Sequence, residues 1–191
     1  GFTITGGAVG INGLTSGATN TAITNGTIIG SLAGVALSDG GIVRNVRVVS
    51  VTGSEATCGA IKCLDHCTIT GNTADANTVC SPAGAITVGA DALVTGNSVN
   101  DTTGGPGILA GSGAFISGNT VNSNSADGIE VVGAGALVAH NTASGNTIGL
   151  NFGANQGGYE DNVLTGNSSA DTQGGTSLGG GNTNLCTAGV C

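Results

Sequence analysis

The sequence predicts an all-β fold: a parallel β-helix, or solenoid, of about eight coils of 21–25 residues. Small side chains dominate, since 38 of the 191 residues are Gly, whereas charged residues make up 7% and aromatic residues 2%. A Gly followed by a small or branched aliphatic residue recurs along the chain at nearly constant steps. No segment keeps apolar residues at helical spacing. This pattern favours a narrow core filled by one or two aliphatic side chains per short strand.

The repeat is visible in three phased series of residues. The Gly-aliphatic series advances by 24, 25, 25, 23, 21 and 21 residues through Gly10, Gly34, Gly59, Gly84, Gly107, Gly128 and Gly149. One Asn series advances by 22, 22 and 21 residues through Asn97, Asn119, Asn141 and Asn162. Another advances by 22 and 21 through Asn124, Asn146 and Asn167. Because the three markers share one period, each period is predicted to be one structural unit.

Each unit is predicted to contain three short strands, as in residues 115–117, 120–122 and 128–131, which Gly, Asn or Asp residues separate. Equivalent strands of successive coils would stack about 4.8 Å apart, which gives a rod roughly 40 Å long. We expect two rows of aliphatic and aromatic side chains to line the interior of this rod. The rows are Ile108, Ile129 and Leu150, and Leu93, Phe115 and Leu137.

The phased asparagines predict a ladder along the rod. An Asn that bends inward at a turn tolerates left-handed backbone angles and can exchange amide hydrogen bonds with the Asn of the next coil. Solvent-exposed loops would explain why Asn is abundant but not why it keeps phase. The predicted ladder consists of Asn97, Asn119, Asn141 and Asn162.

The strings VTGNSV, ISGNTVNSNSADGIEVV and VAHNTASGNTIGLNF resemble the repeats of the right-handed, pectate-lyase-like parallel β-helix superfamily. The resemblance implies a right-handed, three-sheet β-helix. We expect one domain over residues 1–191, whose Gly-rich end at residues 174–191 is closed by a disulfide. The superfamily says little about activity, because the scaffold hosts lyases, hydrolases, epimerases, fibres, adhesins and inert structural proteins.

The six cysteines favour disulfides and an oxidising compartment, and therefore a secreted protein. Cys58 and Cys80 occupy nearly the same place on successive coils, so the repeat favours a bridge between them. Cys63 would then pair locally with Cys67, and Cys186 with Cys191. A metal centre is the alternative, but the segment 63–67 lacks a second Cys pair at zinc-finger spacing. We therefore predict no metal and no cofactor.

The distribution of charged and of apolar residues excludes nucleic acid as a partner and a span across a membrane. The net charge is -8, and the only basic side chains are Arg44, Arg47 and Lys62, so no basic track exists for nucleic acid. Gly, Asn, Ser or Thr interrupts every aliphatic stretch within a few residues, which excludes a membrane-spanning segment.

No catalytic residue is predicted, because the carboxylate and basic motifs of polysaccharide lyases and hydrolases on this scaffold are missing. One constellation could hold an anionic sugar or relay a proton: Arg44, Arg47, Lys62, Asp65 and His66, in which Arg44 and His66 are 22 residues apart. A surface ion pair is the other interpretation of these residues. The single His140 is interpreted as a surface or core-edge residue.

The predicted function is a secreted, non-catalytic structural protein at the cell surface or outside the cell. A coil begins at Phe2 and Ile4, and we expect these residues to form the surface through which copies stack head to tail into a filament or layer. Two alternatives remain open. One is a carbohydrate-active enzyme that acts on an anionic polysaccharide, and the other is a glycan-binding or ice-binding adhesin module.

Overall fold

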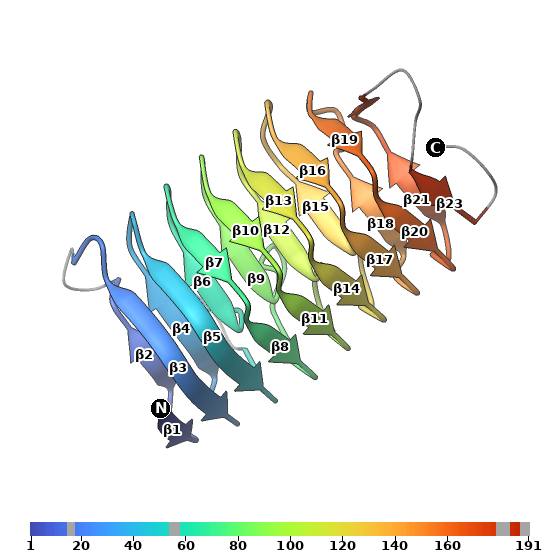
Figure 1. Cartoon of the computed structure of the whole chain (residues 1–191). Helices are drawn as coiled ribbons and strands as arrows, with labels where there is room; N and C mark the ends of the chain where they lie inside the picture. Colours follow the sequence, from blue (N-terminus) through green and yellow to red (C-terminus); the bar gives the residue numbers. More distant parts are fainter. Residues whose placement is uncertain (15–17, 54–57, 179–183, 188–191) are drawn as a thin grey trace.

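The computed structural model describes residues 1–14, 18–53, 58–178 and 184–187, and these residues contain β-strands and no helix. The predicted all-β solenoid is confirmed. The chain winds through parallel strands that stack from the N-terminal to the C-terminal end (Figure 1), and one 8-stranded sheet takes a strand from each turn.

The strands lie in three columns. The first column contains residues 22–24 and 42–44, then β7 (Thr68–Thr70), β10 (Leu93–Thr95), β13 (Phe115–Ser117), β16 (Leu137–Ala139), β19 (Gly158–Glu160) and β22 (Thr176–Ser177). The second contains β1 (Phe2–Thr5), residues 26–29 and 47–49, β8 (Thr73–Asp75), β11 (Ser98–Asn100), β14 (Thr120–Asn122), β17 (Thr142–Ser144), β20 (Val163–Thr165) and β23 (Leu185–Cys186). The third contains β2 (Val9–Asn12), β4 (Ala33–Leu37), β6 (Ile61–Cys63), β9 (Ile86–Val88), β12 (Ile108–Ala110), β15 (Ile129–Val131), β18 (Ile148–Asn151) and β21 (Ala170–Gln173).

The first and second columns belong to one 15-stranded sheet, whereas the third is a sheet of its own. They are joined because β3 (Ala22–Ile29) and β5 (Ile42–Val49) run through the bend between them without interruption. From β7 onwards a turn divides each long strand into two short ones. The strands β22 and β23 extend the first two columns into the segment 174–191, which was expected to form the disulfide-closed end.

The interior is lined by one or two side chains from each short strand. In the third column Ile108 is paired with Ile129, and Ile129 with Leu150, and all three are buried as predicted. In the three-residue strands of the first column, from β7 to β19, the middle residue is buried instead, as Val94, Ile116 and Val138 show.

The row Leu93, Phe115 and Leu137 was predicted to be core, and this prediction is wrong. These residues are stacked in register, but Leu93 is 38% exposed and Phe115 is 39% exposed. Successive residues of a strand point to opposite faces, and each of these residues precedes a buried one. Phe115 therefore lies on the outer face because Ile116 occupies the core.

Buried asparagines form a continuous ladder at the turn between the first and second columns. Asn97 donates from its backbone N–H and from Nδ2 to Oδ1 of Asn119, both at 2.9 Å, and Asn119 repeats the pattern with Asn141. The row is Asn72, Asn97, Asn119, Asn141, Asn162 and Asn184. The ladder asparagines do not themselves adopt the left-handed backbone that was expected. The preceding residue does, as Gly96 with φ of 63° and His140 with φ of 59° show.

A second ladder lies at the turn between the second and third columns, and Thr102 interrupts it. Asn124 bonds to Asn146, and Asn146 to Asn167, by the same paired contacts. Thr102 donates its backbone N–H to Oδ1 of Asn124 at 3.0 Å. Within the described part of the chain, Thr102 Oγ1 is the only buried side-chain N or O atom without a hydrogen-bond partner.

We expect Thr102→Asn to raise the free energy of unfolding by about 1–2 kcal/mol, because an Asn side chain would join Asn77 to Asn124 and remove the unpaired hydroxyl. Chemical denaturation followed by circular dichroism measures the change. The matched control is Thr103→Asn at the neighbouring exposed position, which should be neutral. A Thr102→Asn variant no more stable than this control would contradict the ladder explanation.

Candidate functional site

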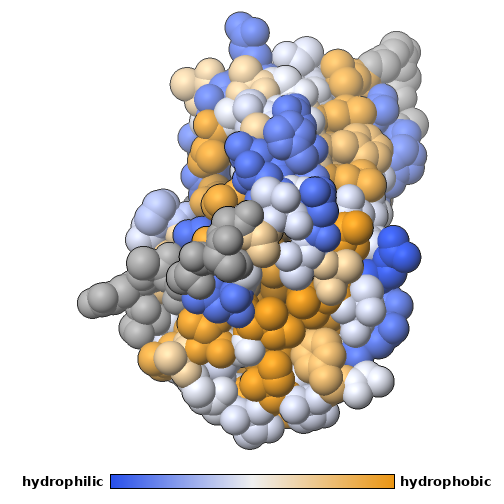
Figure 2. Space-filling model, turned by 90° about the vertical axis from the view of Figure 1, so that its left-hand side faces the viewer, coloured by the Kyte–Doolittle hydropathy of each residue, from blue (hydrophilic) through white to orange (hydrophobic). Residues whose placement is uncertain are grey.

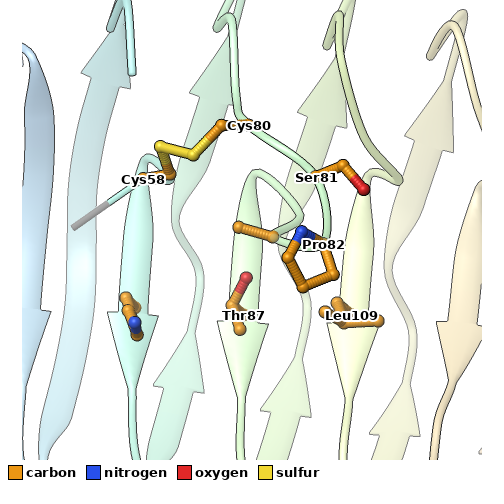
Figure 3. A pocket seen from close by; sticks show the side chains of 8 residues that line it. Cys58, Cys80, Ser81, Pro82, Thr87 and Leu109 are labelled. Atoms are coloured by element: carbon orange, nitrogen blue, oxygen red, sulfur yellow. A yellow bond between two sulfur atoms is a disulfide. The ribbon is translucent and has the colours of Figure 1, made fainter. Parts of the chain in front are cut away.

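A pocket of about 390 Å³ opens on the outer face of the third column. Its floor consists of Lys62, Thr87 and Leu109, which are paired neighbours on β6, β9 and β12. A loop forms its wall, and Figure 3 shows Ser81 and Pro82 of this loop beside Thr87 and Leu109. The remaining lining residues are Cys58, Cys80 and Ala83.

The pocket exists because two of the coils carry extra residues at one turn. The distance from the second ladder position to the next buried strand is 9 residues from Asn77 to Ile86, but 5 residues from Asn124 to Ile129. The extra residues leave the rod as the loop that includes residues 80–83. Insertions in a solenoid form loops on one face, which is often the binding face. The longer step from Gly59 to Gly84 was the sequence signal for this loop, and it was not interpreted as a site.

The loop is held in place by covalent and hydrogen bonds. Cys80 is joined to Cys58 of the preceding coil, and the backbone N–H of Ala83 donates to the Cys80 carbonyl at 2.8 Å. Thr87 Oγ1 accepts from the Gly84 N–H at 2.9 Å and donates to the Gly84 carbonyl at 3.2 Å. The loop is therefore fixed to Cys58 of the preceding coil at one end and to Thr87 in the floor of the pocket at the other.

The electrostatics of this face change along its length. Lys62 carries the only charge among the lining residues of the pocket. Glu130 follows Leu109 in the register but does not line the pocket. Burial raises the pKa of the Glu130 carboxyl, and the negative charge of Asp127 raises it further. Asp127 Oδ2 in turn accepts a hydrogen bond from Asn151 Nδ2 at 2.6 Å.

The cysteines are oxidised where the structure describes them. Cys58 is bonded to Cys80 with Cα atoms 5.7 Å apart, and Cys63 to Cys67 with Cα atoms 6.2 Å apart. Cys186 is also disulfide-bonded, and its expected partner Cys191 lies outside the described residues. Disulfides form and persist in oxidising compartments, so this is an exported protein. The described residues contain no helix of the length and apolarity that a membrane span requires.

The constellation around Arg44 and His66 is not brought together, so the interpretation as one site is wrong. The strand register pairs Arg44 with Thr70, and His66 lies in the turn before that strand. Lys62 belongs to the other sheet. The ion pairs are local: Arg47 with Asp75 at 4.0 Å, and His66 Nε2 with Asp91 Oδ2 at 3.7 Å. His140 pairs in the same way with Asp161, at 3.5 Å, and all these side chains are at least one-third exposed.

Phe2 and Ile4 lie at the N-terminal end of the rod. They align with Gly26 and Ile28 and point inward, but they are only partly buried. Ile11 and Ile23 are also only partly buried. We call the four residues Phe2, Ile4, Ile11 and Ile23 the end surface. Figure 2, which faces the left-hand side of Figure 1, shows a hydrophobic patch there.

Three stacked columns of parallel strands around a narrow core define a parallel β-helix protein. A family model described as periplasmic copper-binding protein (NosD) matches residues 2–187, and the chain therefore belongs to the NosD family. A comparison with curated proteins found no match. Among solved structures, trypsin-treated QnrB1, described as a plasmid-mediated fluoroquinolone resistance protein, is similar at 14% identity and a TM-score of 0.35. The alignment covers 93% of this chain and 92% of that one.

The residues of this chain do not fit the copper site that the family description implies. Protein copper sites are built from His, Cys and Met ligands. The sequence has no Met and 2 His, and the cysteines that the structure describes are all in disulfides. His66 and His140 lie in different turns, each beside one aspartate. Over the described ranges, no three His, Cys, Asp or Glu side chains gather to hold a metal ion.

Proposed function

We propose that this protein is an exported, non-catalytic structural solenoid whose copies stack end to end into a filament or surface layer. The observation that carries the proposal is the end surface, where the hydrophobic side chains of Phe2 and Ile4 are only partly buried. Completing that burial in an assembly would contribute up to roughly 1.5–3 kcal/mol for each side chain. The disulfides and the description of its family support a location outside the cytoplasm, in the periplasm or at the cell surface.

The sheet topology supports a second copy as the occupant of the end surface. The 8-stranded sheet ends in β2 on one side and β21 on the other, and the larger sheet ends in β1 at one end and in β22 and β23 at the other. Among the described residues, each column therefore has a terminal strand at both ends of the rod. The backbone groups of such an edge can pair with an added strand. Another copy presents these edges with the same three-column geometry, and head-to-tail contacts of this kind propagate as open filaments.

The test compares the full chain with Phe2→Asp. We expect the wild-type protein to form rods longer than one subunit and the variant to stay monomeric, because a buried, unpaired carboxylate costs more than the contact contributes. Light scattering over a concentration series and electron microscopy measure the assembly. Phe2→Asp should keep its β-sheet circular dichroism, because the remaining coils of a solenoid stack independently.

The matched control is Phe115→Asp, which makes the same chemical change on the side wall of the rod, where Phe115 is exposed. This variant should assemble as the wild type does. A wild-type protein that stays monomeric at high concentration would defeat the proposal. Equal loss of assembly in both variants would place the contact on the side wall instead of the end surface.

A further inference from the structure

We propose that two rods pair side by side and antiparallel, with Phe115 of each copy inserted into a hollow above Gly158 of the other copy. The contact is separate from the end-to-end stacking, because its residues and the end surface do not overlap. Its lasting form, a pair of rods, rests on that stacking, whereas its register rests only on the shape of one face of the subunit.

A row of outward-facing residues runs along the first column, and we call it the outer row. The strand register stacks its members in the order Leu93, Phe115, Leu137, Gly158 and Thr176. Their strands β10, β13, β16, β19 and β22 follow one another along the rod (Figure 1). Phe115 is the largest side chain of the row and is 39% exposed. It lies one coil before Leu137, and Gly158 lies one coil after it.

A hollow of about 470 Å³ opens where Gly158 takes its place in the outer row. Leu137 and Leu178 line it, and the Leu178 side chain lies beside the position that a Cβ atom of Gly158 would occupy. Gln156 and Thr176 contribute polar groups to the lining. A phenyl ring that enters a hollow bordered by leucines leaves the water, and buried aromatic side chains of this kind dominate the binding energy of protein interfaces.

A two-fold axis along β16 makes the outer row complementary to itself. Rotation about this axis reverses the direction of the rod and keeps the direction of the strands, so the coil before β16 in one copy meets the coil after β16 in the other. Phe115 then faces Gly158 of the second copy, and Gly158 faces its Phe115, as a two-fold contact requires. An axis along β13 would instead oppose the two Phe115 rings and leave the hollow empty.

Charge also favours a second copy at this face. The net charge of -8 makes two copies repel each other over most of their surface. In the strands β7, β10, β13 and β16, however, the outward-facing residues are Thr, Leu, Phe, Ser and Ala, which carry no charge. The outward-facing Glu160 of β19 would lie opposite Ser117 of the second copy, and a serine hydroxyl can donate a hydrogen bond to a carboxylate.

The contact is small for one subunit and large for a rod. Five strands about 4.8 Å apart, each about 10 Å long, cover roughly 250 Å² per copy. Stable interfaces bury about 800 Å² per partner, so two single subunits pair only transiently and scatter light as monomers. Subunits stacked in a rod repeat the contact at every step, and repeated weak contacts add up to a stable pair.

The test links two copies covalently at the two-fold axis. The thiols of two paired Leu137→Cys chains lie opposite each other, whereas those of Leu93→Cys lie four coils, or about 19 Å, apart. A short bismaleimide should therefore link Leu137→Cys into dimers at least about fivefold faster than Leu93→Cys. Equal rates would indicate chance collisions and overturn the proposal. A faster reaction of Phe115→Cys would overturn the register, because the axis would then run along β13.

A second pair of variants tests the inserted ring. In the Leu137→Cys chain, Phe115→Ala should slow the linking at least about fivefold, with β-sheet circular dichroism retained. The matched control Val163→Ala removes a side chain of similar exposure, 38%, from the second column and should not change the rate. A Phe115→Ala chain that links as fast as this control would overturn the insertion of Phe115.

The same reaction separates this proposal from the stacking. Leu137→Cys is compared in the unchanged chain and together with Phe2→Asp, which blocks the end surface. Fast linking in both without any rods would refute the stacking and leave the pairing in place, whereas rods without linking would refute the pairing. By electron microscopy we expect wild-type rods in pairs, and Phe115→Asp rods of the same length that stay single.

Discussion

Asn119→Ala is expected to lower the free energy of unfolding by about 4–6 kcal/mol, the largest effect of any single change considered for this chain. Asn119 is 1% exposed and occupies the middle of the first ladder. Its Oδ1 accepts from the backbone N–H and from Nδ2 of Asn97, and its Nδ2 donates to the Val94 carbonyl at 2.9 Å. Ala would leave several of these buried groups without partners, and each such group costs about 1–3 kcal/mol.

Urea denaturation followed by circular dichroism measures this loss. The matched control is Asn122→Ala, which removes the same side chain from the outer face of β14, where Asn122 Oδ1 accepts one bond from Ser144. Because Asn122 is only partly buried, water can replace the lost bond, and the control should cost no more than about 1 kcal/mol. If the two variants lost similar stability, the ladder would not be a major source of the stability of the solenoid.

Gly128→Ala is expected to cost about 3 kcal/mol, although it adds a single methyl group. A Cβ atom at Gly128 would lie 2.7 Å from the Gly149 carbonyl oxygen and 2.8 Å from Asn146 Nδ2. The first is backbone of the next coil and the second belongs to the second ladder, so neither can move without breaking hydrogen bonds. The same crowding by ladder amides occurs at Gly107 and Gly149, which explains why Gly precedes the aliphatic residue in these coils.

The control for this prediction is Gly96→Asn. Gly96 has φ of +63° and its Cβ position has no other atom within 4 Å, so this glycine is needed for its backbone angle and not for space. Asn tolerates that conformation, and the chain itself places Asn45 at the equivalent turn with φ of 53°. Thermal unfolding should show Gly96→Asn close to the wild type and Gly128→Ala well below it. The reverse order would refute the distinction between the two kinds of glycine.

The sequence by itself determined the solenoid, its period and the aliphatic row Ile108, Ile129 and Leu150. Each coil must place equivalent residues on top of one another, so the period of the stack is written directly in the spacing of Gly and Asn. The Asn series could be located for the same reason. Asn72 and Asn184 were not included because the coils beside them differ in length or lack the flanking strings.

The direction of Phe115 could not be predicted in this way. Its strand has three residues, and both Phe115 and Ile116 are hydrophobic, so alternation alone allows either residue to face the core. In the structure Ile116 and the following ladder residue Asn119 are both buried, whereas Phe115 is 39% exposed. Leu93 and Leu137 follow Phe115 outward because the coils are in register.

The pocket was decided by tertiary structure alone. Its floor combines Lys62, Thr87 and Leu109, which lie 25 and 22 residues apart in the chain and become neighbours only when three coils stack. Its wall is a loop whose position depends on a disulfide to the preceding coil. Stacked coils repeat, so they leave a period in the sequence. A loop that departs from the repeat leaves no such period, so its conformation could not be inferred from the equivalent turns of the other coils.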